Sequence, residues 1–232
     1  MQNMVSETVN AAPSVEIKIG SEVVSKQHFV APQVKKVAGG KGYLFVKRLF
    51  DIVASLAAIL VLLIPMLVIA ICIKLDSPGT VLYKQVRLGK NGKPFHVLKF
   101  RSMRMDAEAG GAQWASENDP RVTKIGAFLR KCRLDELPQL FCILFGTMSI
   151  VGPRPERPVF YDEFDKYIDG FRQRLLVAPG LTGLAQVCGG YDLEPEEKII
   201  FDIEYIENRC LRLDLKVIFD TVAIIFNHKG AR

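Results

Sequence analysis

Two adjacent carboxylates, Asp135 and Glu136, are the residues of this sequence whose types and spacing point most directly to chemistry. Because proline is tolerated only in the first turn of a helix, Pro138 places both carboxylates at a helix N-terminus. Free backbone N–H groups at such an end favour anions, including phosphate. Adjacent carboxylates can also hold Mg²⁺ through oxygen ligands while one acts as nucleophile or base. The alternative is a helix cap by Asp135, with Glu136 in the first turn.

Cationic side chains accompany this pair in the sequence. Arg130, Lys131 and Arg133 come directly before it, which gives the carboxylates a cationic neighbourhood that suits a phosphorylated substrate. Prolines flank Arg154 within residues 152–155. They fix the backbone and hold Arg154 in one direction, which suits a bidentate grip on phosphate. A rigid turn with an exposed arginine is the alternative.

Lys99 and Arg101 form a further cationic group. They lie on one face of a β-like run, because strand side chains alternate with period two. A solvated strand face is the alternative here. The sequence has no P-loop, dinucleotide-binding fingerprint or nucleophile elbow. Its five cysteines include no C-x-x-C pair, which argues against a disulfide framework and structural zinc. Basic residues gather beside an apolar segment, so nucleic acid is not an expected partner.

An uncharged apolar segment, residues 52–73, must position these groups. It explains why a chain of 232 residues with a net charge of +6 has a mean hydropathy of +0.18. At about 1.5 Å per residue it is long enough to cross a hydrocarbon core of about 30 Å. Lysines and arginines flank both of its ends, and such residues prefer the cytosolic side of a membrane.

Pro65 lies near the middle of this segment, where its ring removes a backbone hydrogen bond and kinks a helix. A re-entrant membrane helix hairpin over about residues 48–75, broken at Pro65 with both ends cytosolic, satisfies both observations. The alternative is a straight membrane-crossing helix with a tolerated proline.

The remaining pattern predicts an α+β fold that is mostly helical. We expect residues 1–42 to form a mobile N-terminal tail with a short strand near 15–19, and residues 43–232 to form one membrane-associated domain. A small β-hairpin is predicted within residues 80–103, turning at an Asn-Gly pair. Further helices are predicted over 125–132, 137–145, 160–171, 195–208 and 211–226. The first of these is basic and amphipathic, which is typical of helices on an anionic membrane surface.

The order of motifs resembles one protein family over about residues 47–226. These motifs read KRLFD, an apolar run with a central proline, KFRSM, LDELPQL, MSIVGPRPE and PGLTGLAQV. They are similar to those of the bacterial polyprenyl-phosphate sugar-1-phosphate transferases, the monotopic phosphoglycosyl transferases, in their small catalytic-domain form. Departures from the family pattern include Ile64 before the proline, where relatives often have serine, and Cys142 after LPQLF.

The resemblance implies an activity and its partners. In this family a sugar-1-phosphate passes from a UDP-sugar to undecaprenyl phosphate with release of UMP, through a covalent phosphosugar–aspartate intermediate. The reaction begins the assembly of exopolysaccharide, capsule, O-antigen or glycoprotein glycans. It requires Mg²⁺ and implies contact with membrane phospholipid at the cytosolic face of the bacterial inner membrane. A homodimer remains open.

The resemblance also implies roles for individual residues. Asp135 and Glu136 match the catalytic dyad, with Asp135 as nucleophile and Mg²⁺ ligand. Substrate binding is expected of Arg154 in the Pro-Arg-Pro loop, of Lys99 and Arg101 in the basic strand, of Arg130 near the lipid phosphate, and of Lys198 and Asp202 in a C-terminal pattern.

Two other classes of protein remain open from the sequence. A non-enzymatic adaptor at a lipid surface would have the same anchor but would release no nucleotide. A bitopic glycosyltransferase that forms a glycosidic bond would release UDP instead of UMP. The nucleotide product therefore separates the three hypotheses.

Overall fold

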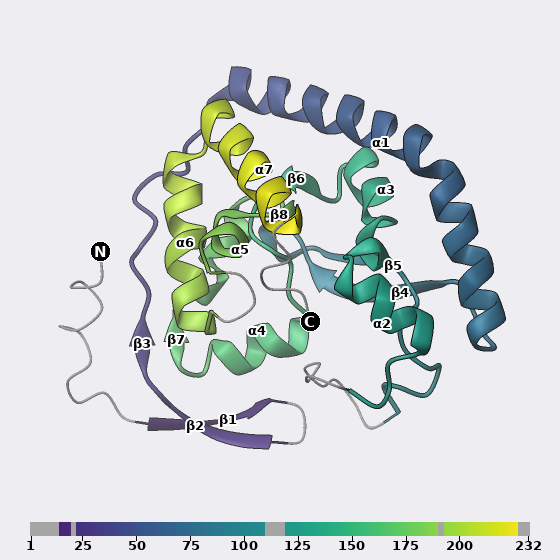
Figure 1. The fold of residues 1–232 in the computed structure, drawn as a ribbon. Coiled ribbons are helices and arrows are strands. Elements are labelled where there is room, and N and C mark those ends of the chain that lie inside the picture. The colour runs from purple at the N-terminus through teal and green to yellow at the C-terminus, as the bar shows by residue number, and fades with distance from the viewer. Residues whose placement is uncertain (1–13, 20–21, 110–118, 190–192, 227–232) are drawn as a thin grey trace.

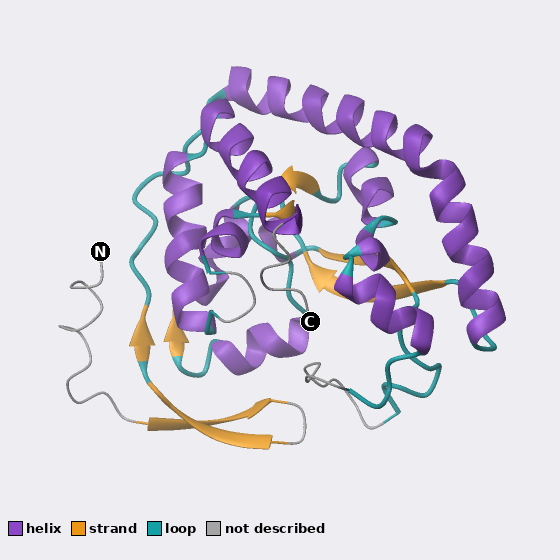
Figure 2. Ribbon diagram, in the orientation of Figure 1, coloured by secondary structure: helices purple, strands orange, loops and turns teal. Residues whose placement is uncertain are grey.

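The protein has an α+β fold in a computed structural model that describes residues 14–19, 22–109, 119–189 and 193–226. Helices dominate, and the strands of the described residues pair two by two (Figure 2). The strands are β1 Ser14–Ile19, β2 Glu22–Gln27, β3 Phe29–Val30, β4 Leu82–Leu88, β5 Pro94–Phe100, β6 Ser149–Val151, β7 Ile168–Asp169 and β8 Gly180–Thr182. The α-helices are α1 Lys41–Asp76, α2 Lys124–Lys131, α3 Gln139–Leu144, α4 Pro158–Phe164, α5 Leu184–Cys188, α6 Pro195–Asn208 and α7 Leu211–Phe226. Three 3₁₀ turns are η2 Lys90–Gly92, η3 Leu134–Glu136 and η4 Phe171–Leu176 among these residues.

Helix α1 contains the predicted membrane segment and is longer than the sequence indicated. It runs for 36 residues, and its most apolar window has a mean hydropathy of 3.2 with only 17% of its residues buried. The helix is continuous through Pro65, and Figure 1 shows it bent around one side of the molecule. Proline is a common cause of such a bend because its ring clashes with the carbonyl four residues earlier, here that of Val61. A return of both ends to one membrane face stays a prediction.

The predicted β-hairpin is confirmed as β4 and β5. The strands pair antiparallel from Leu82 opposite Phe100 to Leu88 opposite Pro94. Asn91 and Gly92 turn the chain between them with left-handed φ values of 58° and 71°, a conformation that favours these two residue types.

The hairpin rests on helix α1 and on α3 through a buried apolar cluster. Val97 of β5, Ile143 of α3 and Ile59 of α1 meet in this cluster, and Ile143 is fully buried. Burial of such side chains contributes about 1.5–3 kcal/mol each. Helix α1 is therefore part of the support for the hairpin.

A second buried cluster holds the C-terminal half of the fold. Its aromatic centre includes Phe160 and Phe164 of α4 and Phe171 of η4, with Ile199 of α6. The predicted single helix over 160–171 is wrong, because α4 ends at Phe164 and β7 then pairs with β3. Gly170 turns the chain with a φ of 87°, so the aromatic spacing reflects a helix, a strand and a 3₁₀ turn in succession.

The segment before Gly40 carries more structure than the predicted short strand. That strand is present as β1, and it pairs with β2 over its whole length. Ile17 of β1 is fully buried in the aromatic cluster. Of the predicted mobile tail, residues 1–13 lie outside the described residues.

The predicted basic helix over 125–132 is confirmed as α2. Helix α2 begins after Thr123, whose hydroxyl accepts a hydrogen bond of 3.0 Å from the N–H of Gly126. Its Phe128 is 58% exposed, while the next residue, Leu129, is 1% exposed. This amphipathicity matches the expectation, while contact with a membrane stays a prediction.

Candidate active site

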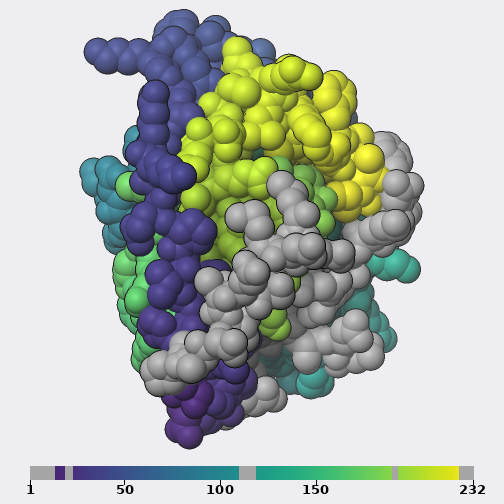
Figure 3. Space-filling model, turned by 90° about the vertical axis from the view of Figure 1, so that its left-hand side faces the viewer, coloured from purple at the N-terminus to yellow at the C-terminus, as the bar shows by residue number. Residues whose placement is uncertain are grey.

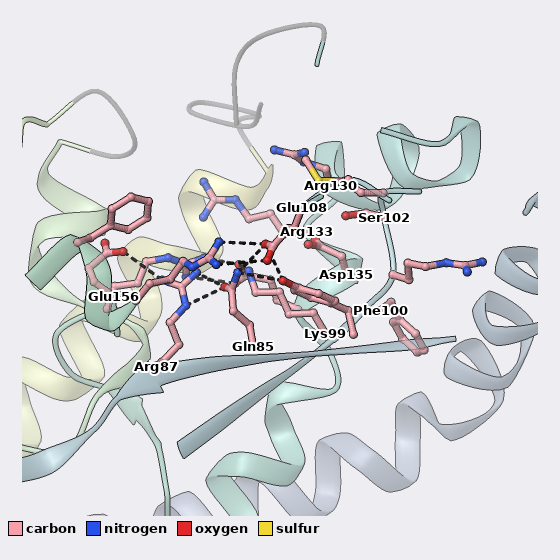
Figure 4. Close-up of a pocket in the computed structure, with 18 of the residues that line it drawn as sticks. Gln85, Arg87, Lys99, Phe100, Ser102, Glu108, Arg130, Arg133, Asp135 and Glu156 are labelled. Atoms are coloured by element: carbon pink, nitrogen blue, oxygen red, sulfur yellow. Dashed lines mark hydrogen bonds and ion pairs between the residues drawn. The ribbon is translucent and has the colours of Figure 1, made fainter. Parts of the chain in front are cut away.

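A cavity of about 480 Å³ opens between the hairpin, the turn η3 and the C-terminal half of the fold. Figure 4 shows side chains from these elements converging on it. Its lining contains ten basic and four acidic side chains. Such a surplus of positive charge suits a ligand with several phosphate groups.

Asp135 and Glu136 lie side by side in this lining but not where the sequence analysis placed them. They belong to the 3₁₀ turn η3, and α3 begins only at Gln139. Arg133, with a left-handed φ of 56°, leads the chain into the turn. No side-chain cap is formed at the start of η3 or α3. The alternative interpretation of Asp135 as a helix cap is therefore wrong.

Glu136 is held by two cations. Its Oε1 lies 3.0 Å from Lys99 Nζ, and both of its oxygens accept hydrogen bonds from the guanidinium of Arg154. Burial alone would raise the pKa of Glu136, but the charges of Arg154 and Lys99 and their hydrogen bonds outweigh it and hold the pKa well below its usual range. Glu136 is therefore ionised and fully engaged.

Asp135 has the opposite surroundings. Asp135 is 8% exposed and lines the cavity. Its carboxylate accepts no hydrogen bond from a donor among the described residues. Burial raises its pKa, and the negative charge of Glu136 adds to this, while Lys99, Arg154 and Arg130 oppose it. Two neighbouring carboxylates thus have different roles, one paired and one available to a ligand.

The backbone of the loop that carries Arg154 is held in place by its neighbours, and its flanking prolines predicted such a rigid loop. Gly152 packs so closely on the following loop that a Cβ there would lie 2.4 Å from the carbonyl oxygen of Ala178. Arg174 supports the loop from the other side by donating a 3.0 Å hydrogen bond to the carbonyl of Arg154. The direction of the Arg154 side chain toward Glu136 is thereby set by the fold.

A comparison with known proteins gives the family. A model of the family described as bacterial sugar transferase matches residues 42–228. The chain belongs to the bacterial sugar transferase family. The matched region contains the cavity, the dyad and the long apolar helix, while residues 14–40 precede it.

Named members of the bacterial sugar transferase family are similar over most of this chain. A UDP-N-acetylgalactosamine-undecaprenyl-phosphate N-acetylgalactosaminephosphotransferase of Aeromonas hydrophila is 45% identical over 82% of the chain and 46% of its own length. A UDP-glucose:undecaprenyl-phosphate glucose-1-phosphate transferase of Klebsiella pneumoniae is 47% identical over 80% of the chain and 41% of its own length. The exopolysaccharide production protein PSS of Rhizobium leguminosarum bv. phaseoli is 45% identical over 77% of the chain and 94% of its own length. The chain thus spans less than half of the first two relatives.

The cavity lining contains the dyad and five of the six predicted substrate-binding residues: Lys99, Arg101, Arg130, Arg154 and Lys198. Figure 4 shows Lys99 and Arg130 on the same side of the cavity as Asp135.

Two of the six predicted residues, Arg101 and Asp202, bind other parts of the protein. Arg101 is 4% exposed, and its guanidinium donates hydrogen bonds of 2.6 and 2.7 Å to the carbonyls of Pro78 and Ser77, just past the end of α1. Asp202 does not line the cavity but forms a buried ion pair of 2.7 Å with Arg174. Their expected roles in substrate binding stay predictions, and these contacts indicate structural roles.

Strand β4 contributes three cavity residues that were not predicted from the sequence. Tyr83, Gln85 and Arg87 lie on one face of the strand and line the cavity beside Lys99, which pairs with Tyr83 across the hairpin. Arg87 also bonds to Glu156, whose carboxylate lies 3.1 Å away. The sequence could have predicted these residues, because they alternate along a strand and alternate residues of a strand share a face.

The residues present fit Mg²⁺ only together with a phosphorylated ligand. No group of three metal-ligating side chains occurs among the residues that the structure describes. Since Glu136 is occupied by two cations, Asp135 is the carboxylate of the dyad available to a metal ion. Mg²⁺ commonly binds through one or two carboxylates plus substrate phosphates and keeps several waters, so this donor set is compatible with it.

Proposed function

We propose that this protein transfers a sugar-1-phosphate from a UDP-sugar to undecaprenyl phosphate, releases UMP, and proceeds through a phosphosugar–Asp135 intermediate. The names of the relatives support the two substrates. The single observation that carries the mechanism is the asymmetry of the dyad. Asp135 presents to a cationic cavity a carboxylate that receives no hydrogen bond from the described residues, while Glu136 beside it is neutralised by Lys99 and Arg154.

In the proposed first step, a carboxylate oxygen of Asp135 attacks the β-phosphorus of the UDP-sugar. The bond from that phosphorus to the bridging oxygen breaks, and UMP leaves with the electron pair. In the second step, a phosphate oxygen of the lipid attacks the same phosphorus. The Asp135 carboxylate is then restored, and undecaprenyl-diphosphate sugar is formed.

The cations of the cavity stabilise the charge that develops on the phosphate oxygens. Arg154 and Lys99 are already oriented by Glu136, so they need no rearrangement when charge develops. Glu136 is accordingly a residue that positions two cations in this proposal. Asp135 would also hold Mg²⁺, which when bound supplies further positive charge to the diphosphate.

Helix α1 would hold this cavity at the level of the lipid phosphate. Its apolar side chains are exposed along its length, and Arg101 and the cluster around Ile59 tie it to the hairpin that carries Lys99. We propose that α1 enters and leaves on the cytosolic face of the bacterial inner membrane. The reaction would be the first membrane step of glycan synthesis, such as exopolysaccharide or capsule.

Identification of the nucleotide product tests the proposal. Purified protein in detergent is incubated with undecaprenyl phosphate, Mg²⁺ and a panel of UDP-sugars, and nucleotides are separated by chromatography. The proposal predicts UMP from at least one sugar, and omission of Mg²⁺ should abolish its release. Release of UDP would support a glycosyltransferase, and no nucleotide from any sugar would support a lipid-surface adaptor.

A further inference from the structure

An N-terminal segment outside the family match is bound along α6, the helix that contributes Lys198 to the cavity lining. We call residues 26–38 the strap. Figure 1 shows it running beside α6 from the lower hairpin to the start of α1, and Figure 3 shows it as a continuous dark column beside the yellow-green surface of α6. The strap thus connects the first hairpin, α6 and the membrane helix.

The strap is fastened at several points along its length. Val34 N–H donates to the Gln173 side chain at 2.6 Å, and Lys35 N–H donates to the Glu207 side chain at 2.6 Å. Ala38 N–H donates to the carbonyl of Ile206 at 3.0 Å. Main-chain pairing of β3 with β7 adds to these bonds.

At its other end the strap reaches the first turn of α6. Lys26 Nζ lies 3.0 Å from a carboxylate oxygen of Glu194 and 3.2 Å from one of Glu196. Glu194 is the N-cap residue of α6, and a capping box joins it to Glu197. Tyr167 donates a further hydrogen bond of 3.0 Å to Glu196. The ion pairs therefore fix the orientation of this turn.

Lys198 stands on the same turn and lines the cavity. Its N–H donates to the carbonyl of Glu194 at 3.0 Å, so its backbone is bonded directly to the residue that Lys26 holds. The side chain of Lys198 is half-buried, and this burial lowers its pKa. A small rotation of the first turn of α6 would move this amine relative to the other cations of the cavity.

We propose that the strap is a positioning element that acts through the Lys26 ion pairs to place Lys198 where it binds the phosphate groups of the substrate. The inference rests on the proposed function, because the phosphates are those of the UDP-sugar. Lys26 does not line the cavity and is a positioning residue.

A double-mutant cycle on Lys26 and Lys198 tests the inference. Loss of one charged contact to phosphate in Lys198→Gln should raise the KM for the UDP-sugar about tenfold. Lys26→Gln should raise it about threefold, because a partly exposed ion pair contributes less, and should leave kcat within about twofold. The double variant should have the same KM as Lys198→Gln alone, since Lys26 acts through Lys198. If the KM increases of the two single variants multiply in the double variant, the inference is wrong.

Two matched variants control for charge and for structure. Lys18→Gln removes the same charge from an exposed position of the same hairpin and should leave KM unchanged. Lys26→Arg keeps both ion pairs within reach and should restore the wild-type KM. An equal effect of Lys18→Gln, or failure of the arginine variant to rescue, would contradict a role for these ion pairs.

Hydrogen exchange separates failure of the inference from failure of the proposed function. Amides of the peptide covering 193–203 should exchange faster in Lys26→Gln than in wild type and in Lys18→Gln, because their first turn loses its clamp. If no UDP-sugar yields UMP, the proposed function fails while this readout still tests the hold of Lys26 on α6. Unchanged exchange in this peptide would overturn the inference.

Discussion

Arg174 lies 2.7 Å from Asp202, and the two side chains are 2% and 3% exposed. The charges of Asp202 and of nearby Glu156 are among those that hold the pKa of Arg174 above its usual range despite its burial. The same guanidinium bonds to the carbonyl of Arg154. The ion pair therefore supports the loop that directs Arg154 toward Glu136. Asp202, which the sequence predicted as a substrate-binding residue, is thus connected to the dyad through Arg174 and Arg154.

Replacement of Asp202 by Asn should destabilise the fold. It leaves Arg174 as a buried unpaired charge, which typically costs about 3–5 kcal/mol. Thermal unfolding in detergent should show a lower Tm, with kcat reduced more than KM is raised. An unchanged Tm together with a raised KM for the UDP-sugar would instead support direct substrate binding by Asp202.

Replacement of Glu136 by Gln should abolish most activity and lower the Tm at neutral pH. The pKa of Glu136 is held low in the fold, so its ionised form contributes stability that is present above the ordinary glutamate pKa of about 4.3. As the pH falls below that value, the contribution is lost. Tm measured from pH 8 down to about pH 2 should therefore show a constant difference between the wild type and Glu136→Gln above about pH 5, and a shrinking difference below about pH 4.3. A difference that stays constant at these low pH values would contradict the pairing described above.

Replacement of Asp135 by Asn should abolish transfer while stabilising the fold. Burial raises the pKa of Asp135, so its ionised form opposes folding at neutral pH. Relief of such a cost at an active site is commonly worth about 0.5–2 kcal/mol, or a rise of a few degrees in Tm. The advantage should shrink as the pH falls and wild-type Asp135 becomes protonated. A lower Tm for Asp135→Asn at pH 7 would contradict the unpaired state of this carboxylate.

Both ends of α1 should be accessible from the cytosol. Phe45 is 72% exposed before the predicted membrane segment, and Pro78 is exposed just past the end of α1, so cysteines at both positions would be free to react. In a background without the native cysteines, a membrane-impermeant maleimide should label Phe45→Cys and Pro78→Cys from the same side of oriented vesicles. Pro65→Leu should straighten the helix and place the two positions on opposite sides. Labelling from opposite sides in the chain with Pro65 would refute the re-entrant topology.

Local patterns predicted the elements of this fold better than the roles of its charged residues. The Asn-Gly turn and the helices over 195–208 and 211–226 follow from short-range spacing, and all are present. The spacing of Lys99 and Arg101 indicated a shared face, yet Arg101 lies after the end of β5 and bonds to the end of α1. Which partner a cation finds depends on tertiary packing, and no local pattern contains that information.

The dyad also shows that local sequence patterns do not reveal the partners of charged residues. The sequence identified Asp135 and Glu136 as a pair but gave no means of assigning different states to them. Their difference arises because Lys99 and Arg154, 36 and 19 residues away from Asp135 along the chain, both converge on Glu136. The role of the strap was likewise hidden, since Lys26 and Glu194 are joined only in three dimensions.

Detection of the covalent intermediate tests the central claim most directly. The protein is incubated with a UDP-sugar that it accepts, with Mg²⁺ but without undecaprenyl phosphate, and is then examined by intact-protein and peptide mass spectrometry. The account predicts release of at most one UMP per protein and a mass increase of one sugar phosphate on the peptide that contains Asp135. Addition of undecaprenyl phosphate should remove the label, and Asp135→Asn should show neither UMP nor label. UMP release that occurs only with the lipid present, with no label on Asp135 at any time, would contradict it.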